Sequence, residues 1–324
     1  NLRALSQFLY RLSFPYRRII SYYSSMVDLS AYAIIPSYDY EKEDVDAMLK
    51  QYHETANQVE KMNMPAQIMQ MLTIAWREDC FYGYIYEDEK GFFIMPLDGK
   101  CCKVSSMDFK GNLNFAFDFS YFRSNNAYLD YWDNEFAKKY KKYQTDNSLR
   151  WQELDPSKTV CIKVNIDDKT LVMPPLASIF EMLIDLIDLM SVQALNDELS
   201  TYKLLVAKLN TLSGTNTPDD FEVDLDTAIE FYNRLADSLP DGVSSAMSVL
   251  DIEPITFKDD QTENVNKISS SMSNLFANVG VSQILDTTKI SGSTAFNASV
   301  MADTLMSIRV LLPQIENFVN KHLR

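Results

Sequence analysis

Histidine, cysteine and glycine are scarce in this chain, and their scarcity limits the chemistry that the sequence can carry. The 324 residues include 2 histidines, 4 cysteines and 8 glycines. His53 and His322 each stand alone in a stretch with helical spacing, so neither marks a catalytic pair or a metal site. Gly99-Lys100 lacks the upstream glycine and the following serine or threonine of a phosphate-binding loop. The carboxylates show no spacing typical of an acid–base pair. The sequence therefore argues against an enzyme and against a bound metal or other cofactor.

The cysteines and the apolar runs exclude two further classes. The cysteines form no CxxC pair, so we expect reduced, buried thiols in a protein made in the cytoplasm. They are Cys80, Cys101, Cys102 and Cys161. A membrane-spanning helix needs about 18 or more apolar residues with few or no charges. The nearest stretch, Met173–Met190, contains three carboxylates, so no contact with a membrane is expected.

Basic residues are scarce in the second half of the chain. Residues 1–172 carry 21 basic and 24 acidic residues, whereas residues 173–324 carry 9 and 21. A half this acidic does not bind nucleic acid by neutralising phosphates, although it can surround nucleic acid without holding it. The first half contains one basic run, Lys138 to Lys142, which we interpret as a solvated helix face.

Helices are predicted at the start of the chain. They are residues 2–34, interrupted at Phe14-Pro15, then Glu41–Met62, and a helix from Pro65 to Trp76. The second of these should turn one apolar face inward. That face consists of Val45, Leu49, Tyr52, Ala56 and Val59.

From Cys80 the apolar residues alternate as in strands. Phe81–Tyr86 and Phe92–Pro96 form one predicted hairpin, and Cys101–Ser106 and Leu113–Phe119 form a second. We expect both hairpins to belong to one small antiparallel sheet. A helix over Tyr128–Tyr143 and a further strand over Thr159–Asn165 should follow.

The longest predicted helix is Pro174–Leu209, which begins with prolines where they cost no hydrogen bond. Two apolar stripes run along it at helical spacing. The first is Leu176, Phe180, Leu183, Ile187 and Met190, and the second is Val192, Leu195, Leu199, Tyr202, Val206 and Leu209. Glu181, Asp185 and Asp188 are assigned to a remaining face. That face is either a solvated acidic surface or one along which a polyanion passes.

An acidic region follows this helix. Residues 211–257 hold ten acidic residues and one basic residue, Arg234. A helix is predicted over Leu225–Leu239 and an extended stretch over Ser248–Phe257. A second long helix, Asp259–Val279, should end at Gly280, since glycine often follows a helix. A loop, Val281–Gly292, and a last helix, Ser293–Leu323, complete the chain.

The order of these elements and three local stretches resemble portal proteins of tailed bacteriophages. The similarity is to the long-tailed, siphovirus-like type from Gram-positive hosts. The stretches are Phe93–Lys103, Phe115–Phe122 and Leu275–Ser282, the last followed by Ser291-Gly292 and a helix that includes Leu312–Glu316. The resemblance covers most of the chain, and its motifs are structural.

The resemblance implies an α+β fold with named parts. Residues 1–172 would form a mixed α/β wing, completed by 293–324. Residues 173–210 and 258–280 would be stem helices, 211–257 a small α/β clip, and 281–292 a tunnel loop. Family members continue into a helical crown, which is therefore absent here or lies beyond Arg324.

The resemblance also implies a function. About twelve copies would form a closed ring at one capsid vertex. Double-stranded DNA would be packaged and ejected through its channel without sequence specificity. Other expected partners are the large subunit of the terminase, a head–tail adaptor, the major capsid protein and the scaffold. The protein would be assembled in the host bacterial cytoplasm and end in the virion. A different ring-forming head–tail connector is the alternative, and a nuclease with Mg²⁺ on the acidic run after Pro218 is a third hypothesis.

Candidate site residues follow from this assignment. The tunnel loop would present Ser282, Gln283, Asp286, Thr287, Thr288 and Lys289 to the channel. Candidates for the channel lining are Glu181, Asp185, Asp188 and Lys267. The clip would dock its partners through Asp219, Asp220, Glu222, Asp224 and Asp226. Negative residues along a channel would keep DNA mobile, because positive ones would condense on its phosphates.

Overall fold

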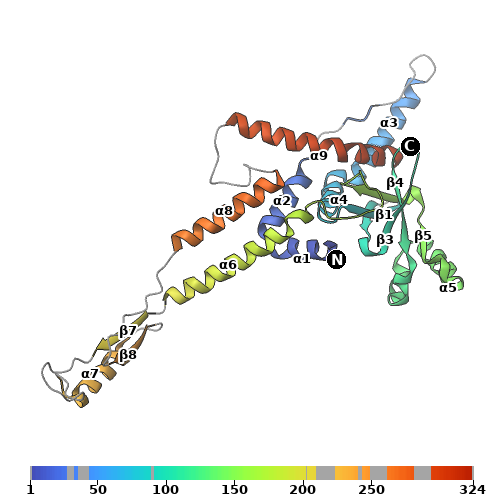
Figure 1. Ribbon diagram of the computed structural model, residues 1–324. Helices are drawn as coiled ribbons and strands as arrows, with labels where there is room; N and C mark the ends of the chain where they lie inside the picture. Colours follow the sequence, from blue (N-terminus) through green and yellow to red (C-terminus); the bar gives the residue numbers. More distant parts are fainter. Residues whose placement is uncertain are drawn as a thin grey trace. The chain divides into compact units, whose positions relative to one another are not determined.

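A computed structural model describes residues 2–27, 33–35, 44–88, 91–201, 203–208, 223–239, 243–248, 261–280 and 293–322 (Figure 1). These residues form a mixed α+β fold with nine α-helices and two three-stranded antiparallel sheets, which confirms the predicted class. The chain divides into two compact units. The first is Asn1–Leu183 with Leu275–Arg324, and the second is Ile184–Asn274.

Three helices pack together at the start of the first unit. They are α1 (Leu2–Leu12), α2 (Phe14–Ser25) and α4 (Met64–Glu78). The predicted break at Phe14-Pro15 is confirmed, because Ser13 caps α2 by accepting from the Tyr16 amide and Pro15 occupies the first turn. The apolar face of α2 is buried and consists of Tyr16, Ile19, Ile20 and Tyr23.

The helix α3 (Val45–Met62) differs from its prediction. It starts after the N-cap Asp44 and ends at Asn63, whose backbone is left-handed with φ 43°. Val59 and Met62 are buried, and the helix packs against a neighbouring strand. Val45, Leu49 and Tyr52, which were predicted to face inward, are exposed. The prediction was wrong for the first turns, because only the last turns meet the body of their unit.

Both predicted hairpins are confirmed. The first pairs β1 (Cys80–Asp88) with β2 (Gly91–Pro96), and the second pairs β3 (Cys102–Met107) with β4 (Leu113–Asp118). They do not share a sheet, contrary to our prediction. The free side of β1 is taken by β6 (Thr159–Lys163), and that of β4 by β5 (Trp151–Glu153). The sheet orders are therefore β2-β1-β6 and β3-β4-β5.

An aromatic core packs against these strands. Its fully buried rings include Tyr82, Tyr84, Phe115, Phe117, Phe119, Phe122 and Phe136. Phe136 comes from α5 (Asn134–Thr145), which begins later than predicted because Asp133 caps it by accepting from the Glu135 amide. Lys138, Lys141 and Lys142 are exposed as expected, while Lys139 pairs with Glu135 at 2.8 Å.

Short 3₁₀ turns connect these elements. They are η1 (Gly99–Cys101), η2 (Phe119–Arg123), η3 (Asn126–Tyr131), η4 (Asn147–Arg150) and η5 (Pro156–Lys158). The four cysteines are free, as expected, and only Cys101 is partly exposed.

The predicted helix Pro174–Leu209 is shorter in the structure. A 3₁₀ turn, η6 (Ala177–Ile179), follows the two prolines, and α6 spans Phe180–Thr201. Lys203–Lys208 forms a strand, β7, which pairs in parallel with β8 (Val243–Ser248). The connection contains α7 (Leu225–Ser238), close to its predicted bounds. The apolar spacing around Val206 fits a helix as well as a strand. The pairing of β7 with β8, which is distant in the sequence, decides that this stretch is a strand.

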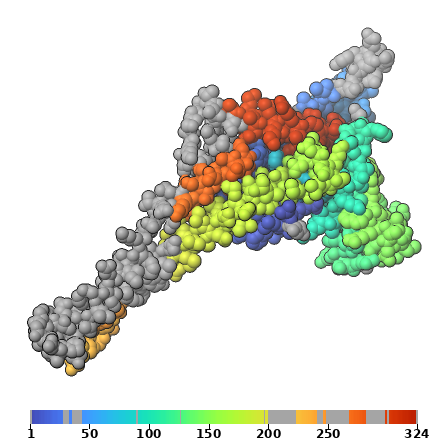
Figure 2. All heavy atoms as spheres, viewed as in Figure 1, coloured from blue at the N-terminus to red at the C-terminus, as the bar shows by residue number. Residues whose placement is uncertain are grey.

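Two helices close the chain. The helix α8 (Gln261–Val279) ends at Gly280, whose φ of +82° confirms the predicted glycine cap. The helix α9 (Ser293–His322) continues past Pro313, and its atoms are visible at the surface in Figure 2. Among the described helices, none has the length and apolar character needed to cross a bilayer.

Candidate functional site

The acidic residues predicted to line a channel lie on α6. Glu181, Asp185 and Asp188 are all exposed. Their spacing of four and three residues continues through Val192 and Leu195, which are also exposed. At about 100° per residue, all five share one helix face. The assignment of the carboxylates to a separate face was therefore wrong: one face is acidic in its first turns and apolar afterwards.

The other predicted site residues are only partly described. Lys267 is exposed on α8. Asp224 is the N-cap of α7 and accepts from the Thr227 amide at 3.3 Å, and Asp226 is exposed in the first turn. A capping carboxylate stabilises its helix, so Asp224 has a structural role. The remaining acidic residues Asp219, Asp220 and Glu222, and the whole tunnel loop from Ser282 to Lys289, lie outside the described residues.

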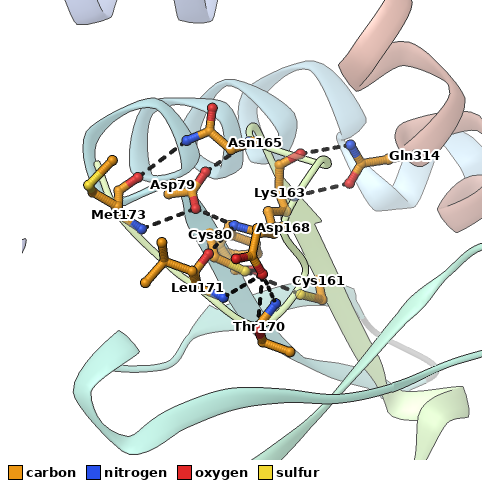
Figure 3. A network of polar contacts seen from close by, with 11 residues as sticks. Asp79, Cys80, Cys161, Lys163, Asn165, Asp168, Thr170, Leu171, Met173 and Gln314 are labelled. Atoms are coloured by element: carbon orange, nitrogen blue, oxygen red, sulfur yellow. Dashed lines mark hydrogen bonds and ion pairs between the residues drawn. The ribbon is translucent and has the colours of Figure 1, made fainter. Parts of the chain in front are cut away.

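A buried polar network lies where α4 enters β1 (Figure 3). Asp79 and Lys163 form an ion pair whose side chains are both fully buried. The Asp79 carboxylate also accepts from the Asn165 amide at 2.9 Å and the Met173 amide at 3.3 Å. Lys163 donates to the Leu171 carbonyl at 2.9 Å. One carboxylate therefore holds both ends of the segment that leads from β6 towards α6.

The backbone at Asp79 is unusual for a residue with a side chain. Its φ is +75°, a conformation that costs free energy outside glycine. The carboxylate bonds and the bond from the Val164 amide to the Asp79 carbonyl, at 2.9 Å, fix this conformation. Burial raises the pKa of Asp79, and the bonds from Lys163 and the Asn165 amide oppose that rise. The position combines backbone strain, burial and charge.

The segment after β6 is held by further side-chain bonds. Asp168 accepts from the amides of Thr170 and Leu171, each at 3.0 Å. Gln314 from α9 donates to the Lys163 carbonyl at 2.8 Å and accepts from the Lys163 amide at 3.0 Å. The amide side chain of Gln314 thus occupies the place of a neighbouring strand (Figure 3).

The helix α2 makes a second set of anchoring contacts within the first unit. The Tyr16 ring meets Phe180, the first residue of α6, with centroids 5.7 Å apart. The Tyr23 hydroxyl donates to the Val279 carbonyl at the end of α8, at 2.9 Å. The Tyr22 hydroxyl donates to Asp303 of α9 at 3.2 Å. Burial raises the pKa of Tyr22 and Tyr23, so both stay neutral donors. Three tyrosines of one helix therefore hold three later helices.

These contacts position helices and supply no evident reaction chemistry. Within the described part of the chain, no group of three or more histidine, cysteine or carboxylate residues could hold a metal ion. The sequence reasoning missed Asp79, Lys163 and the α2 tyrosines. The one signal of the Asp79–Lys163 pair in the sequence was Lys163 itself. It is a charged residue directly after the apolar residues Val160–Ile162, and a buried lysine requires a partner.

No protein-family profile matches the chain, and no curated protein matches it either.

Proposed function

We propose that this chain is a ring-forming portal protein of a tailed bacteriophage, through which DNA enters and leaves the capsid. In this assignment residues 1–172 and 293–324 are the wing, 173–210 and 258–280 the stem, 211–257 the clip and 281–292 the tunnel loop. The protein is a structural channel and an assembly hub in the virion, without enzymatic activity of its own. The local resemblance to portal proteins suggests the assignment, and one structural observation supports it.

That observation is the number of large apolar side chains that the single chain leaves exposed along its helices. Scattered single apolar side chains are normal on a soluble protein, whereas apolar residues that recur along one helix face, such as Val45 and Leu49 or Val192 and Leu195, are typical of protein–protein contacts. Exposed examples occur on seven of the described helices, α1, α2, α3, α4, α6, α7 and α9. They include Phe8, Leu12, Val45, Leu49, Val192, Leu195, Phe231, Met301 and Met306. A chain with several such faces is expected to contact more than one neighbour, as a subunit of a ring does.

The change of character along one face of α6 fits this proposal. The face is acidic at Glu181, Asp185 and Asp188, and apolar at Val192 and Leu195. We assign the acidic turns to a water-filled channel, where DNA phosphates are repelled and stay mobile. We assign the apolar turns to a neighbouring subunit.

The proposed partners follow from the same assignment. The acidic clip would dock the large terminase subunit during packaging and a head–tail adaptor afterwards, since charged rims set partner choice and association rate. The wing would contact the major capsid protein and scaffold. A different ring-forming connector of the virion is the second candidate, because exposed apolar helices support any ring.

Imaging the purified protein by negative-stain electron microscopy, with its mass measured by light scattering, tests the proposal. We expect rings of about a dozen subunits with a central hole. A monomer at all concentrations would overturn the proposal. A ring that binds an adaptor but fails to support packaging in a virion assembly assay would favour the second candidate.

A further inference from the structure

Two apolar surfaces of the first unit carry opposite charge at their edges. The first, which we call the α3 face, consists of Val45, Leu49 and Tyr52. Val45 is 53% exposed and Leu49 is 45% exposed. The second, which we call the α1–α2 face, consists of Phe8, Leu12 and Phe14, which are 59%, 56% and 68% exposed. Both faces stay open in the single chain, so neither covers the other within one copy.

The α3 face continues a buried stripe. Val45, Leu49, Tyr52, Ala56 and Val59 follow one another at spacings of four, three, four and three residues, which is the pattern of a helix that packs along another helix. Val59 at the end of this stripe is buried, while Ala56 is half-buried. The stripe is therefore covered at one end of α3 and open at the other. Helical turns exposed on all sides are marginal in water without a packing partner.

The charged residues beside the two faces are complementary. Asp46 is exposed and borders the α3 face at about 100° around the helix, and Glu60 is exposed on the same side of α3, beside the covered end of the stripe. Arg11, Arg17 and Arg18 are exposed beside the α1–α2 face. No carboxylate occurs between Leu2 and Val27, and the Glu78 carboxylate that contacts Gln7 is paired with Arg77.

We propose that the α3 face of one copy packs on the α1–α2 face of the next copy. The occupant is a second copy of this chain because both faces are apolar and the charges beside them are of opposite sign. Two different surfaces meet, so the contact is head-to-tail and repeats from copy to copy, which closes into a ring or continues as a filament. The inference rests on the proposed ring and identifies one of its contacts.

Charge reversal tests the contact. One variant carries Arg11→Glu and Arg18→Glu, and the other carries Asp46→Lys and Glu60→Lys. Each variant alone should need at least about tenfold more protein to assemble than the wild type, because like charges then border the contact. An equal mixture should assemble normally, because the acidic α1–α2 face of one variant meets the basic α3 face of the other.

Control variants carry a charge reversal of the same kind, at a single residue, elsewhere. Glu54→Lys lies on the opposite side of α3, and Lys141→Glu lies on α5, and both residues are exposed. Both controls should assemble as the wild type does. Circular dichroism should show that all variants keep the helix content of the wild type, so that a failure to fold is recognised.

The possible results distinguish an error in this contact from an error in the proposed ring. If the wild type forms rings and the reversed variants assemble as well as the controls, the contact is wrong and the ring stands. If neither variant assembles and the mixture fails too, the pairing of the two faces is wrong. As a second measurement, Leu12→Cys and Leu49→Cys in one chain should give disulfide-linked ladders from wild-type-like rings. Rings without such ladders would overturn the contact.

Discussion

Asp79 combines burial, a positive φ and a buried ion pair at one position of the first unit. It is fully buried, has a φ of +75°, and pairs with the fully buried Lys163. A buried ion pair does not itself add much stability, but removing one partner leaves an uncompensated charge. The carboxylate also satisfies two backbone amides that a shorter or apolar side chain would leave without a partner.

Asp79→Asn should lower the free energy of unfolding by about 3–5 kcal/mol, because Lys163 then stays buried without a counter-charge. Asparagine keeps one acceptor oxygen but turns an NH2 group towards a donor, so the loss reports the charge together with a hydrogen bond. Urea denaturation measures it. Adding Lys163→Met should restore most of the stability, whereas the exposed Asp130→Asn should have little effect. Equal stability of Asp79→Asn and the wild type would contradict the account.

Asp118 gives a prediction for pH. Burial raises the pKa of Asp118, but its hydrogen bonds with Arg150 and Ser120 outweigh this effect and hold the pKa below its ordinary value. A lowered pKa contributes stability that is present above the unfolded value of about 4 and is lost as the pH falls through the folded value. Below pH 4 the difference in free energy of unfolding between the wild type and Asp118→Asn should therefore shrink by about 1 kcal/mol.

Unfolding both proteins in urea at pH 7, 4 and 3 measures this difference. The comparison isolates Asp118 from Asp79, whose raised pKa acts in the opposite direction. An advantage that stays constant across this range would show that the Arg150 pair is not formed in solution.

At the scale of elements, local patterns predicted the two hairpins and the glycine-capped end of α8. Alternating apolar residues and the Gly91 turn located β1 and β2, and Gly280 located the end of α8. The failures concern pairing between distant residues. The return of β6 to β1 joins Cys80 to Lys163, which local spacing does not reveal. The same reason explains the separate sheets, the strand β7 and the missed Asp79–Lys163 pair.

The exposed residue Leu195 of α6 allows a test of the proposed contact between subunits. Leu195 is 59% exposed in the single chain, and we assign it to a contact between subunits. Leu195→Asp should shift the protein towards monomers, because a charge buried at a contact costs several kcal/mol. Light scattering across a concentration series measures the shift. Gln144→Asp on α5 introduces the same charge at another exposed position and should leave assembly unchanged.

If Leu195→Asp assembles as readily as Gln144→Asp, the last turns of α6 do not lie between subunits. The acidic and apolar parts of this face would then both be solvated. The first turns are expected to remain folded in either case, since Leu183 and Leu186 are buried.

At the scale of the whole molecule, negative charge is concentrated in the second half of the chain. Residues 173–324 hold 21 acidic and 9 basic residues, and DNA would pass along this half without being held. The segment 281–292, the proposed tunnel loop, lies outside the described residues. Its placement in the channel therefore stays a prediction, as do the docking roles of Asp219, Asp220 and Glu222.

Shortening the stretch Asp286–Lys289 should leave ring assembly intact but let packaged DNA slip or leak. The physical reason is that this stretch would form the narrowest part of the channel and contact phosphates without reading bases. A packaging assay with nuclease protection measures retained DNA. Lys289→Glu alone should have a mild effect that weakens at high salt. Normal retention by the shortened protein would contradict the assignment.

The contact of Gln314 with β6 has a consequence for solubility. The strand β6 is at the edge of its sheet, and its Lys163 backbone donor and acceptor are both bonded to the Gln314 side chain. An open edge strand is a template on which other chains add strands and aggregate. By filling one position of that edge, α9 blocks such growth. Gln314→Leu is therefore expected to aggregate at a lower temperature than the wild type in a turbidity measurement.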